Sequence, residues 1–294
     1  MTCLSDDMKI TDNILTGYTK KDITTLVIPD CITSIGDFAF SGCTELQDIT
    51  MNKVSSVGMN AFMMCNKLQT VTMNNVTHIL RSAFMSTILN TVTMPNVKTI
   101  GDLAFHRCKL TTLKIPKATT IGNNAFSECT ELTNINMPIV TTIGYSAFNT
   151  CTGLTSIIFP NTLTSIGQDA FMSCNRLTSI DLFNILNNVE ITNPSQLNNF
   201  KNAFSNCKNL SSIKLNVKLL DPLNNKLVNS QLKDILHNLG INSNIKVINK
   251  NNYINIKFPI IQKFENIDTN NNVILFTLLL IIIVIIFLIV YKKN

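Results

Sequence analysis

The sequence predicts a repeat protein, a solenoid of short parallel strands and helical turns, followed by one C-terminal transmembrane helix. Two observations support this fold class. The segment "SIGDFAFSGCTELQDITM" at residues 34–51 recurs in closely similar form at residues 120–137 and 142–159. Residues 273–290 then form a run of 18 residues without a charged side chain. Self-similarity at a period of 20 to 50 residues is typical of units that bury their apolar faces only by stacking.

An Ala-Phe pair marks each repeat and gives the number of units. Eight pairs occur, at residues 39–40, 61–62, 83–84, 104–105, 125–126, 147–148, 170–171 and 203–204. Their spacings are 22, 22, 21, 21, 22, 23 and 33 residues. The last spacing is about ten residues too long, which predicts an insertion near residues 183–200.

Each repeat divides into a strand, a turn, a second extended piece and a helical turn. In "LQDITM", apolar Leu46, Ile49 and Met51 occupy the first, fourth and sixth places, and the last two alternate as in a strand. A proline often follows and ends the strand, because proline lacks a backbone donor. The glycine of the next Ile-Gly step fits a tight bend before one helical turn. Ala and Phe, with Cys three residues after Phe, then share one face of this turn and point inward.

The full pattern is Ile-Gly-x-x-Ala-Phe-x-x-Cys-x-x-Leu-x-x-Ile-x-Ile-Pro, as in residues 121–138, where Met137 fills the last apolar place. It resembles the BspA-like leucine-rich repeat family over roughly residues 23–215. The resemblance implies a leucine-rich repeat solenoid and a surface protein linked to adhesion and protein binding. Members occur in bacteria, parasitic protists and large DNA viruses. Thr87 replaces the cysteine of the third repeat, and repeats three and four are one residue short before Leu89 and Leu110.

The rest of the chain suggests caps, a linker and an anchor. Ser230 to Gly240 has an N-cap serine, helically spaced apolar residues and a terminal glycine, which predicts a helix that caps the open end of the solenoid. The predicted segments are an N-terminal cap (1–22), the repeat array (23–215), a C-terminal cap helix (216–240), an Asn-rich linker (241–272), the transmembrane helix (273–290) and a short basic tail (291–294).

Two orientations of the membrane segment stay open. A helix over residues 273–290 would be about 27 Å long, close to the roughly 30 Å hydrocarbon core of a bilayer. The N-terminus has no basic region followed by an apolar run, as a signal peptide would, which favours a cytosol-facing tail anchor. Lys292 and Lys293 instead favour a cytosolic tail with the array outside. The family resemblance favours the cell surface.

Composition and motifs argue against nucleic-acid binding and against catalysis. The formal charge of +6 comes from residues scattered along the chain, without a Lys/Arg block that would follow phosphates, so nucleic acid is not a predicted partner. No catalytic residue, cofactor site or metal site is predicted, because the three histidines occupy unrelated positions and no catalytic motif occurs.

The cysteines are predicted to be packing groups. Seven of nine recur once per repeat, whereas zinc sites need converging ligands. Cys31, near the start of the first repeat, is interpreted in the same way, so no disulfide framework is expected. The seven are Cys43, Cys65, Cys108, Cys129, Cys151, Cys174 and Cys207.

The candidate site is the outward face of the longer strands. Residues between the apolar strand positions form two polar columns. Their hydroxyl residues could simply suit an exposed strand, could order water on ice through Thr-x-Thr ladders, or could belong to a protein-binding face. The predicted binding residues are Lys114, Asn136, Asp181 and Lys214. The predicted function is a membrane-anchored binding or adhesion module; the alternatives are a tail-anchored adaptor facing the cytosol and a structural spacer.

Overall fold

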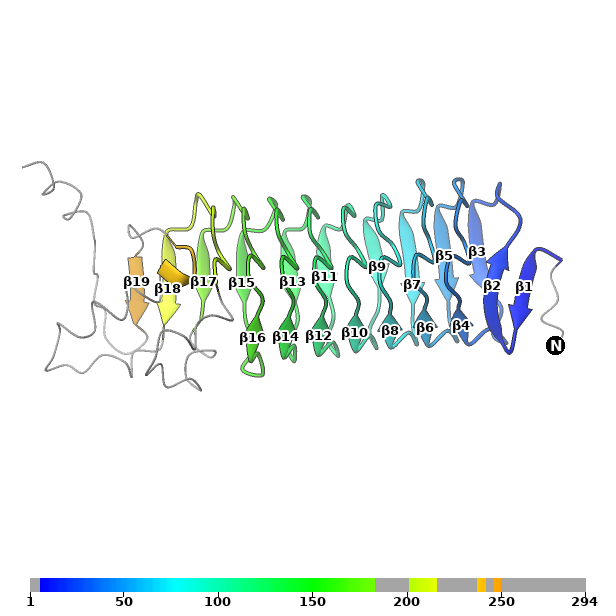
Figure 1. Cartoon of the computed structure of the whole chain (residues 1–294), viewed down its shortest axis with the longest axis horizontal. Coiled ribbons are helices and arrows are strands. Elements are labelled where there is room, and N and C mark those ends of the chain that lie inside the picture. Colours follow the sequence, from blue (N-terminus) through cyan, green and yellow to red (C-terminus); the bar gives the residue numbers. More distant parts are fainter. Residues whose placement is uncertain (1–5, 183–200, 216–236, 242–245, 250–294) are drawn as a thin grey trace, which may run out of the picture. The chain divides into compact units, whose positions relative to one another are not determined.

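The structure is a computed structural model that describes residues 6–182, 201–215, 237–241 and 246–249 (Figure 1). All of them belong to one compact unit, residues 1–256. Within these ranges no helix has the length and apolar character needed to cross a bilayer. The predicted transmembrane helix and basic tail lie outside the described residues, as do most of the predicted cap helix and linker.

The described chain winds into successive coils that add strands to two sides, and this confirms the predicted solenoid (Figure 1). The longer strands form the side that we name the strand face. Its strands are β3 (Thr25–Ile28), β5 (Asp48–Met51), β7 (Thr70–Met73), β9 (Thr91–Thr93), β11 (Thr112–Lys114), β13 (Asn134–Asn136), β15 (Ser156–Ile158), β17 (Ser179–Asp181) and β18 (Ser212–Leu215). Hydrogen-bonded neighbours among them pair in parallel, and the pairing breaks between β9 and β11 and between β13 and β15.

The second side is a continuous sheet of nine strands. Its repeat strands have two residues each, with a polar residue followed by a buried Ile or Val. They are β4 (Ser34–Ile35), β6 (Ser56–Val57), β8 (His78–Ile79), β10 (Thr99–Ile100), β12 (Thr120–Ile121), β14 (Thr142–Ile143) and β16 (Ser165–Ile166).

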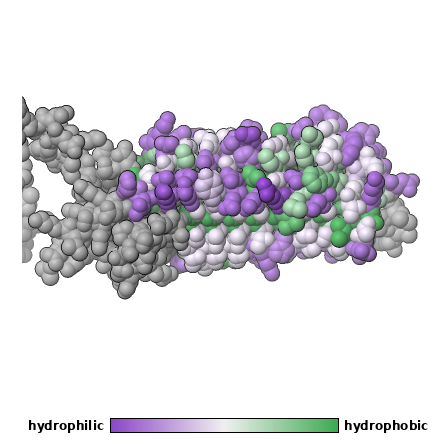
Figure 2. All heavy atoms as spheres, viewed as in Figure 1, coloured by the Kyte–Doolittle hydropathy of each residue, from purple (hydrophilic) through white to green (hydrophobic). Residues whose placement is uncertain are grey.

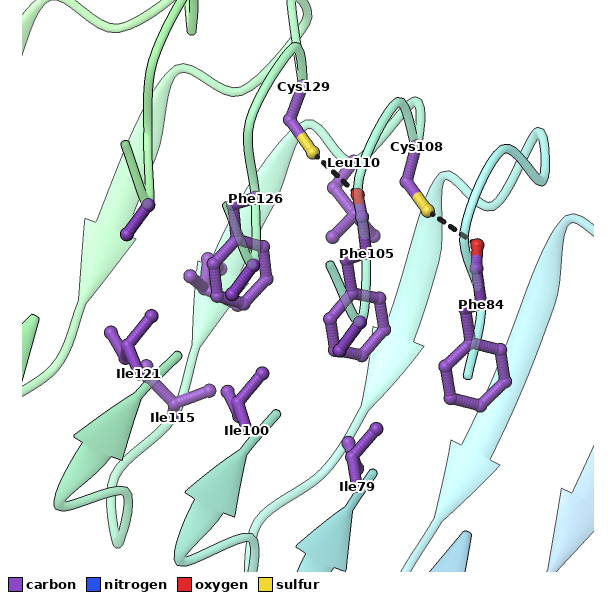
Figure 3. Close-up of a cluster of buried hydrophobic side chains, with 14 of the residues drawn as sticks. Ile79, Phe84, Ile100, Phe105, Cys108, Leu110, Ile115, Ile121, Phe126 and Cys129 are labelled. Atoms are coloured by element: carbon purple, nitrogen blue, oxygen red, sulfur yellow. Dashed lines mark hydrogen bonds between the residues drawn. The ribbon is translucent and has the colours of Figure 1, made fainter. Parts of the chain in front are cut away.

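The core consists of columns of identical or similar side chains, one from each coil. Phe40, Phe62, Phe84, Phe105, Phe126, Phe148, Phe171 and Phe204 form an uninterrupted stack with ring centroids 4.8–5.4 Å apart and planes within 2–11° of parallel. Figure 3 shows three of these rings beside a column of isoleucines from the second sheet. Each coil covers its neighbour's apolar face, which a single repeat could not do alone.

The predicted helical turn is wrong in its local geometry. The segment from Gly to Cys forms three overlapping turns, as in residues 122–125, 124–127 and 126–129. Two of its residues have positive φ, as at Asn124 (54°) and Glu128 (60°). Its N–H groups alternate between their own coil and the next one: Phe126 N donates to Ala147 O at 2.8 Å, and Cys129 N donates to Phe126 O at 3.2 Å. Because half of the donors bond across coils, the backbone cannot close an α-helical ladder. The inward direction of the Ala, Phe and Cys side chains is nevertheless confirmed.

The glycine of the Ile-Gly step is needed for close packing between coils. A Cβ at Gly144 would lie 2.6 Å from the carbonyl carbon of Gly122 in the preceding coil, and the φ of Gly144 is not in the left-handed region. The predicted bend is therefore not what requires glycine here. Leu80 occupies the corresponding position of the third coil and leaves 42% of its surface exposed.

An antiparallel hairpin closes the N-terminal end of the second sheet. Strands β1 (Met8–Thr11) and β2 (Ile14–Tyr18) pair through a two-residue loop, and both loop residues have positive φ, as a type I′ turn requires. β2 then pairs in parallel with β4. The Tyr18 ring lies 5.3 Å from that of Phe40 and extends the aromatic stack.

At the other end, two short segments continue the stack. β19 (Lys246–Asn249) pairs in parallel with β18, within the residues that the sequence assigns to a linker. Asn202 N donates to Asn238 O at 2.7 Å, and Phe204 N donates to Leu239 O at 3.0 Å. Leu239 is buried against the core, so residues 237–241 cover the turn segment of the eighth coil.

Candidate binding face

The strand face carries the predicted binding residues in one column. Parallel pairing places Lys114 opposite Asn136, and Asp181 opposite Lys214. The Lys114 and Asn136 side chains are exposed, and Asp181 is half-buried. The side chain of Lys214 lies outside what the structure describes. The structure therefore brings the four positions together as two adjacent pairs.

The two pairs belong to different hydrogen-bonded sheets. β11 and β13 pair only with each other among the described strands, whereas β15, β17, β18 and β19 form a separate sheet. Within the first pair, Ile115 N, directly after β11, donates to Asn136 O at 3.0 Å and extends the pairing of these two strands by one residue. The candidate residues therefore do not lie on one continuous ladder, which the regular sequence pattern does not reveal.

An exposed apolar side chain, Ile158, lies between the two pairs. It occupies the same outward column and leaves 76% of its surface exposed. The strand alternation already placed it outward, but the sequence pattern alone did not single it out as a binding residue. An exposed isoleucine between polar neighbours adds apolar contact area to the candidate face.

The threonine ladder is confined to the first coils. Thr50, Thr72 and Thr93 pair in register, as do Thr70 and Thr91. A different column of hydroxyls, on the approach to the second sheet, donates to carbonyl oxygens of the preceding coil at 2.9–3.3 Å: Ser55, Thr77, Thr119, Thr141 and Thr164. Hydroxyl residues of this second column therefore stabilise the contact between coils.

A second surface, on the turn side of the stack, is also apolar. Of the eleven large hydrophobic residues that are exposed in the described chain, eight lie between residues 14 and 88. Figure 2 shows hydrophobic patches over this N-terminal half of the stack. Six of the eight lie in the turn segments of the first three coils or directly after one, and we name them the turn-side cluster. They are Phe38, Met59, Met63, Met64, Leu80 and Ile88.

The column cysteines are thiols that hydrogen-bond within the core. Six of them donate from Sγ to the carbonyl oxygen of a Phe in the preceding coil at 3.2–3.3 Å, two of which Figure 3 shows. Burial raises the pKa of Cys108 to about 12, so the thiolate that would bind metal or react does not form at neutral pH. Thr87 fills the same position and donates from Oγ1 to Phe84 O at 2.9 Å. The described residues contain no cluster of three metal-binding side chains.

Cys31 differs from this column, and its interpretation as a packing cysteine is wrong. It is disulfide-bonded, whereas all seven column cysteines are free. It lies in the turn that follows β3 and its side chain is partly buried against the core.

The histidines with described contacts serve separate local interactions. His78 Nδ1 lies 2.7 Å from Thr99 Oγ1 in the next strand of the second sheet. His106 Nε2 lies 3.9 Å from Glu128 Oε1, and Arg107 Nε donates to the other oxygen of that carboxylate at 2.8 Å. Burial lowers the pKa of His106 more than Glu128 raises it.

Comparison with known proteins decides the family. A model described as a BspA type leucine rich repeat region matches residues 10–131, 98–200 and 119–258 in six copies. The chain belongs to this family. No curated protein matches its sequence.

The chain is also similar to solved structures of leucine-rich repeat proteins. One, from Bacteroides ovatus, is 23% identical, with 69% of this chain and 66% of that chain covered and a TM-score of 0.47. A leucine-rich cell surface protein from Faecalibacterium prausnitzii is 20% identical, with 69% and 82% covered and a TM-score of 0.32. A leucine-rich repeat protein from T. pallidum is 18% identical, with 79% and 94% covered and a TM-score of 0.36.

Proposed function

We propose that this leucine-rich repeat protein is a membrane-anchored, non-enzymatic binding or adhesion module that presents its strand face to a protein partner. The observation that carries the proposal is the outward column in which exposed Lys114 and Asn136 lie beside exposed Ile158. Residues 273–290 supply the anchor, as their length and lack of charge indicate. The face is on the cell surface in this proposal.

The geometry suits recognition because the backbone is already fixed. Parallel pairing holds Lys114 and Asn136 in register before any partner arrives, so little backbone entropy is lost on binding. Ile158 offers apolar area, and the flanking charged and amide groups give orientation and reject partners of the wrong charge. The expected partner is a protein surface that combines an apolar contact with complementary polar groups.

The test is a pull-down or cell-binding assay with the full chain in detergent. The variant carries threonine at positions 114, 136, 181 and 214, which lowers the net charge by one because two lysines and one aspartate are lost. Surface changes of this kind usually alter stability by less than about 0.5 kcal/mol. Lys98→Thr is the matched control: it has the same net charge change, and it lies beside the second sheet in a column otherwise occupied by hydroxyl residues.

The proposal expects binding to be lost in the four-position variant and retained in the control. A separate Ile158→Thr variant should weaken binding on its own, because it removes the apolar contact and keeps the charges. Equal binding by all forms would contradict the strand face as the site. A companion variant with Met64→Ser and Ile88→Ser would then show whether the turn-side cluster binds instead.

Two alternatives share the fold and differ in orientation or use. A tail-anchored adaptor would present the same face to the cytosol, and a spacer would bind nothing. Protease protection of the array in sealed vesicles separates the two orientations. A glycan shift at the Asn75-Val-Thr77 sequon would support the lumenal or surface orientation, since Asn75 is exposed. Absence of binding by any form would favour the spacer.

A further inference from the structure

The turn-side cluster combines exposed apolar side chains with an unfavourable backbone conformation. Phe38 has a φ of 56°, and 52% of its surface is exposed. Six of the eight coils have Asn, Ser or Asp at this position, and small polar residues of this kind tolerate positive φ better than bulky ones. A half-exposed aromatic ring here is favoured neither by its backbone conformation nor by full burial, and such outliers concentrate at functional surfaces.

Two opposite charges flank the cluster, in the column of residues that follows the glycine position. Asp37 in the first coil and Arg81 in the third are exposed, and Met59 lies between them in the second coil. Met59 N donates to Asp37 Oδ1 at 2.7 Å, and Asn60 N donates to Arg81 O at 3.1 Å, so the three coils are in register here. Neither charged side chain forms an ion pair with another described residue. The column therefore runs from a negative charge through an apolar residue to a positive charge.

We propose that the turn-side cluster binds the same cluster of a second copy of this chain, with the two stacks antiparallel. A two-fold axis through Met59 places Asp37 of each copy opposite Arg81 of the other. A parallel pairing would instead oppose Asp37 to Asp37 and Arg81 to Arg81, and contacts between like charges disfavour it. Because the same surface serves both copies, the assembly closes as a dimer.

The shapes of the two surfaces are also complementary in this arrangement. Leu80 occupies the column that glycine fills in the first and second coils, and 42% of its surface is exposed. The antiparallel pairing places Leu80 against Gly36 of the other copy, which is partly exposed and has no side chain to obstruct it. Met63 and Met64 lie in the same coil as the axis, and their flexible thioether side chains can adapt to the contact.

The dimer surface is separate from the strand face, so this proposal does not depend on the proposed function. Its residues lie in the turn segments and at the adjoining end of the second sheet, whereas Lys114, Asn136 and Ile158 lie on β11, β13 and β15. Self-association and partner binding are measured with different variants. Failure of one proposal therefore leaves the other to be judged by its own experiment.

Sedimentation equilibrium of the full chain in density-matched detergent tests the proposal. The parent protein is expected to form dimers as its concentration rises. Asp37→Arg and Arg81→Asp each turn two attractive contacts of the symmetric interface into two repulsive ones, so either change should raise the dissociation constant at least about tenfold. The variant that carries both changes again has opposite charges across the antiparallel interface and should recover the dimer. Its recovery also shows that neither substitution unfolds the chain.

The matched control is Arg176→Asp. Arg176 is also exposed, forms no ion pair with another described residue and lies in the seventh coil, so this variant should associate like the parent. A parent protein that stays monomeric would overturn the proposal. Equal association by all variants, as an association through residues 273–290 would give, would overturn it too. Weak association by both single variants without recovery in the double variant would exclude the antiparallel charge pairing.

Disulfide formation between introduced cysteines tests the arrangement directly. With adjacent coils about 4.8 Å apart, Met59 lies beside its equivalent across the axis, whereas Leu80 lies two coils, about 10 Å, from its own. A disulfide needs Cα atoms within about 7 Å. Mild oxidation should therefore give a covalent dimer of Met59→Cys and none of Leu80→Cys, with the parent chain as the background for its native cysteines. Covalent dimers of both variants, or of Leu80→Cys alone, would contradict the antiparallel pairing. Covalent dimers of neither would show that Met59 does not lie at the axis.

Discussion

The rings of Phe171 and Phe204 stack at 5.4 Å with planes 8° apart, although 33 residues separate them in the chain. Other neighbours in the same column are 21 to 23 residues apart and have centroids at 4.8–5.2 Å. β17 and β18 also pair in register across the long interval. The stacking of the eighth coil on the seventh is therefore determined by its inward apolar residues. The longer connection between the two coils does not change this stacking.

Deleting 11 residues within 183–200 should leave the stack intact, because 33 minus 22 is 11 and the shorter chain restores the usual spacing. Closing a loop costs only slightly less free energy when the loop is shorter, so the unfolding midpoint should change little or rise. Urea unfolding followed by circular dichroism measures the change. A large fall in the midpoint would mean that the deleted residues contribute to the packing of the eighth coil.

Phe126→Ala should lower the free energy of unfolding by about 3–5 kcal/mol, since the ring is fully buried between those of Phe105 and Phe148. Lys114→Ala, at an exposed position, is the control and should cost less than about 0.5 kcal/mol. Denaturant titration of both variants compares them. A loss below about 1 kcal/mol in the Phe126 variant would be incompatible with a buried ring.

Stability should fall as the pH rises from about 9 towards 12, because of the column thiols. Burial raises the pKa of Cys65, Cys108 and Cys207 to about 12 in the folded chain, from an ordinary value of 9.0. The folded state therefore keeps its thiol protons while the unfolded state loses them, so the contribution is complete below pH 9 and is lost as the pH approaches 12.

The slope of unfolding midpoint against pH measures this effect. Cys108→Thr removes one titrating thiol and should flatten the slope, since Thr87 already shows that a hydroxyl can donate to the same type of carbonyl. Lysine and tyrosine titrate in both proteins, so the difference between the two slopes isolates the thiol. Identical slopes would mean that Cys108 is not protected from ionisation.

The sequence spacing correctly predicted those features of the fold that depend on residues within one repeat. The inward positions of Ala125, Phe126 and Cys129 follow from their order in the repeat, and all three are buried. The turn geometry was missed because the positive φ values of Asn124 and Glu128 depend on donors that bond to the next coil. The pattern within one repeat does not include the carbonyl groups of the next coil that accept these hydrogen bonds.

The candidate face shows the same division between local and long-range information. Alternation along each strand gave the outward column, but the break in pairing between β13 and β15 is a relation between coils. The bond at Cys31 was missed for the same reason, since residues distant in sequence determine whether a cysteine has a partner. Ile158 was visible in the column, and its apolar side chain at an outward place was the signal.

Acid should destabilise the folded chain through His106. Its side chain is 12% exposed, and its Nδ1 is buried without a hydrogen-bond partner in the structure. Burial lowers its pKa in the folded chain; Glu128 opposes this shift, while Arg107 acts in the same direction as burial. Because the folded pKa lies below the unfolded one, the unfolded state binds a proton first as the pH falls. Stability should decrease as the pH falls below about 6.5, the ordinary histidine value.

The variant His106→Met removes the imidazole. Methionine already occupies the equivalent position, directly after the column Phe, as Met85 in the third coil and Met172 in the seventh. The thermal unfolding midpoints of the two proteins should be compared at about pH 7.5 and about pH 5.5, on either side of the ordinary histidine pKa. The midpoint of the parent protein is expected to fall more than that of the variant between the two pH values, because all other groups are common to both proteins and cancel in the difference. Equal losses would show that His106 accepts its proton in the folded chain as readily as in the unfolded one, and hence that its buried nitrogen is open to solvent.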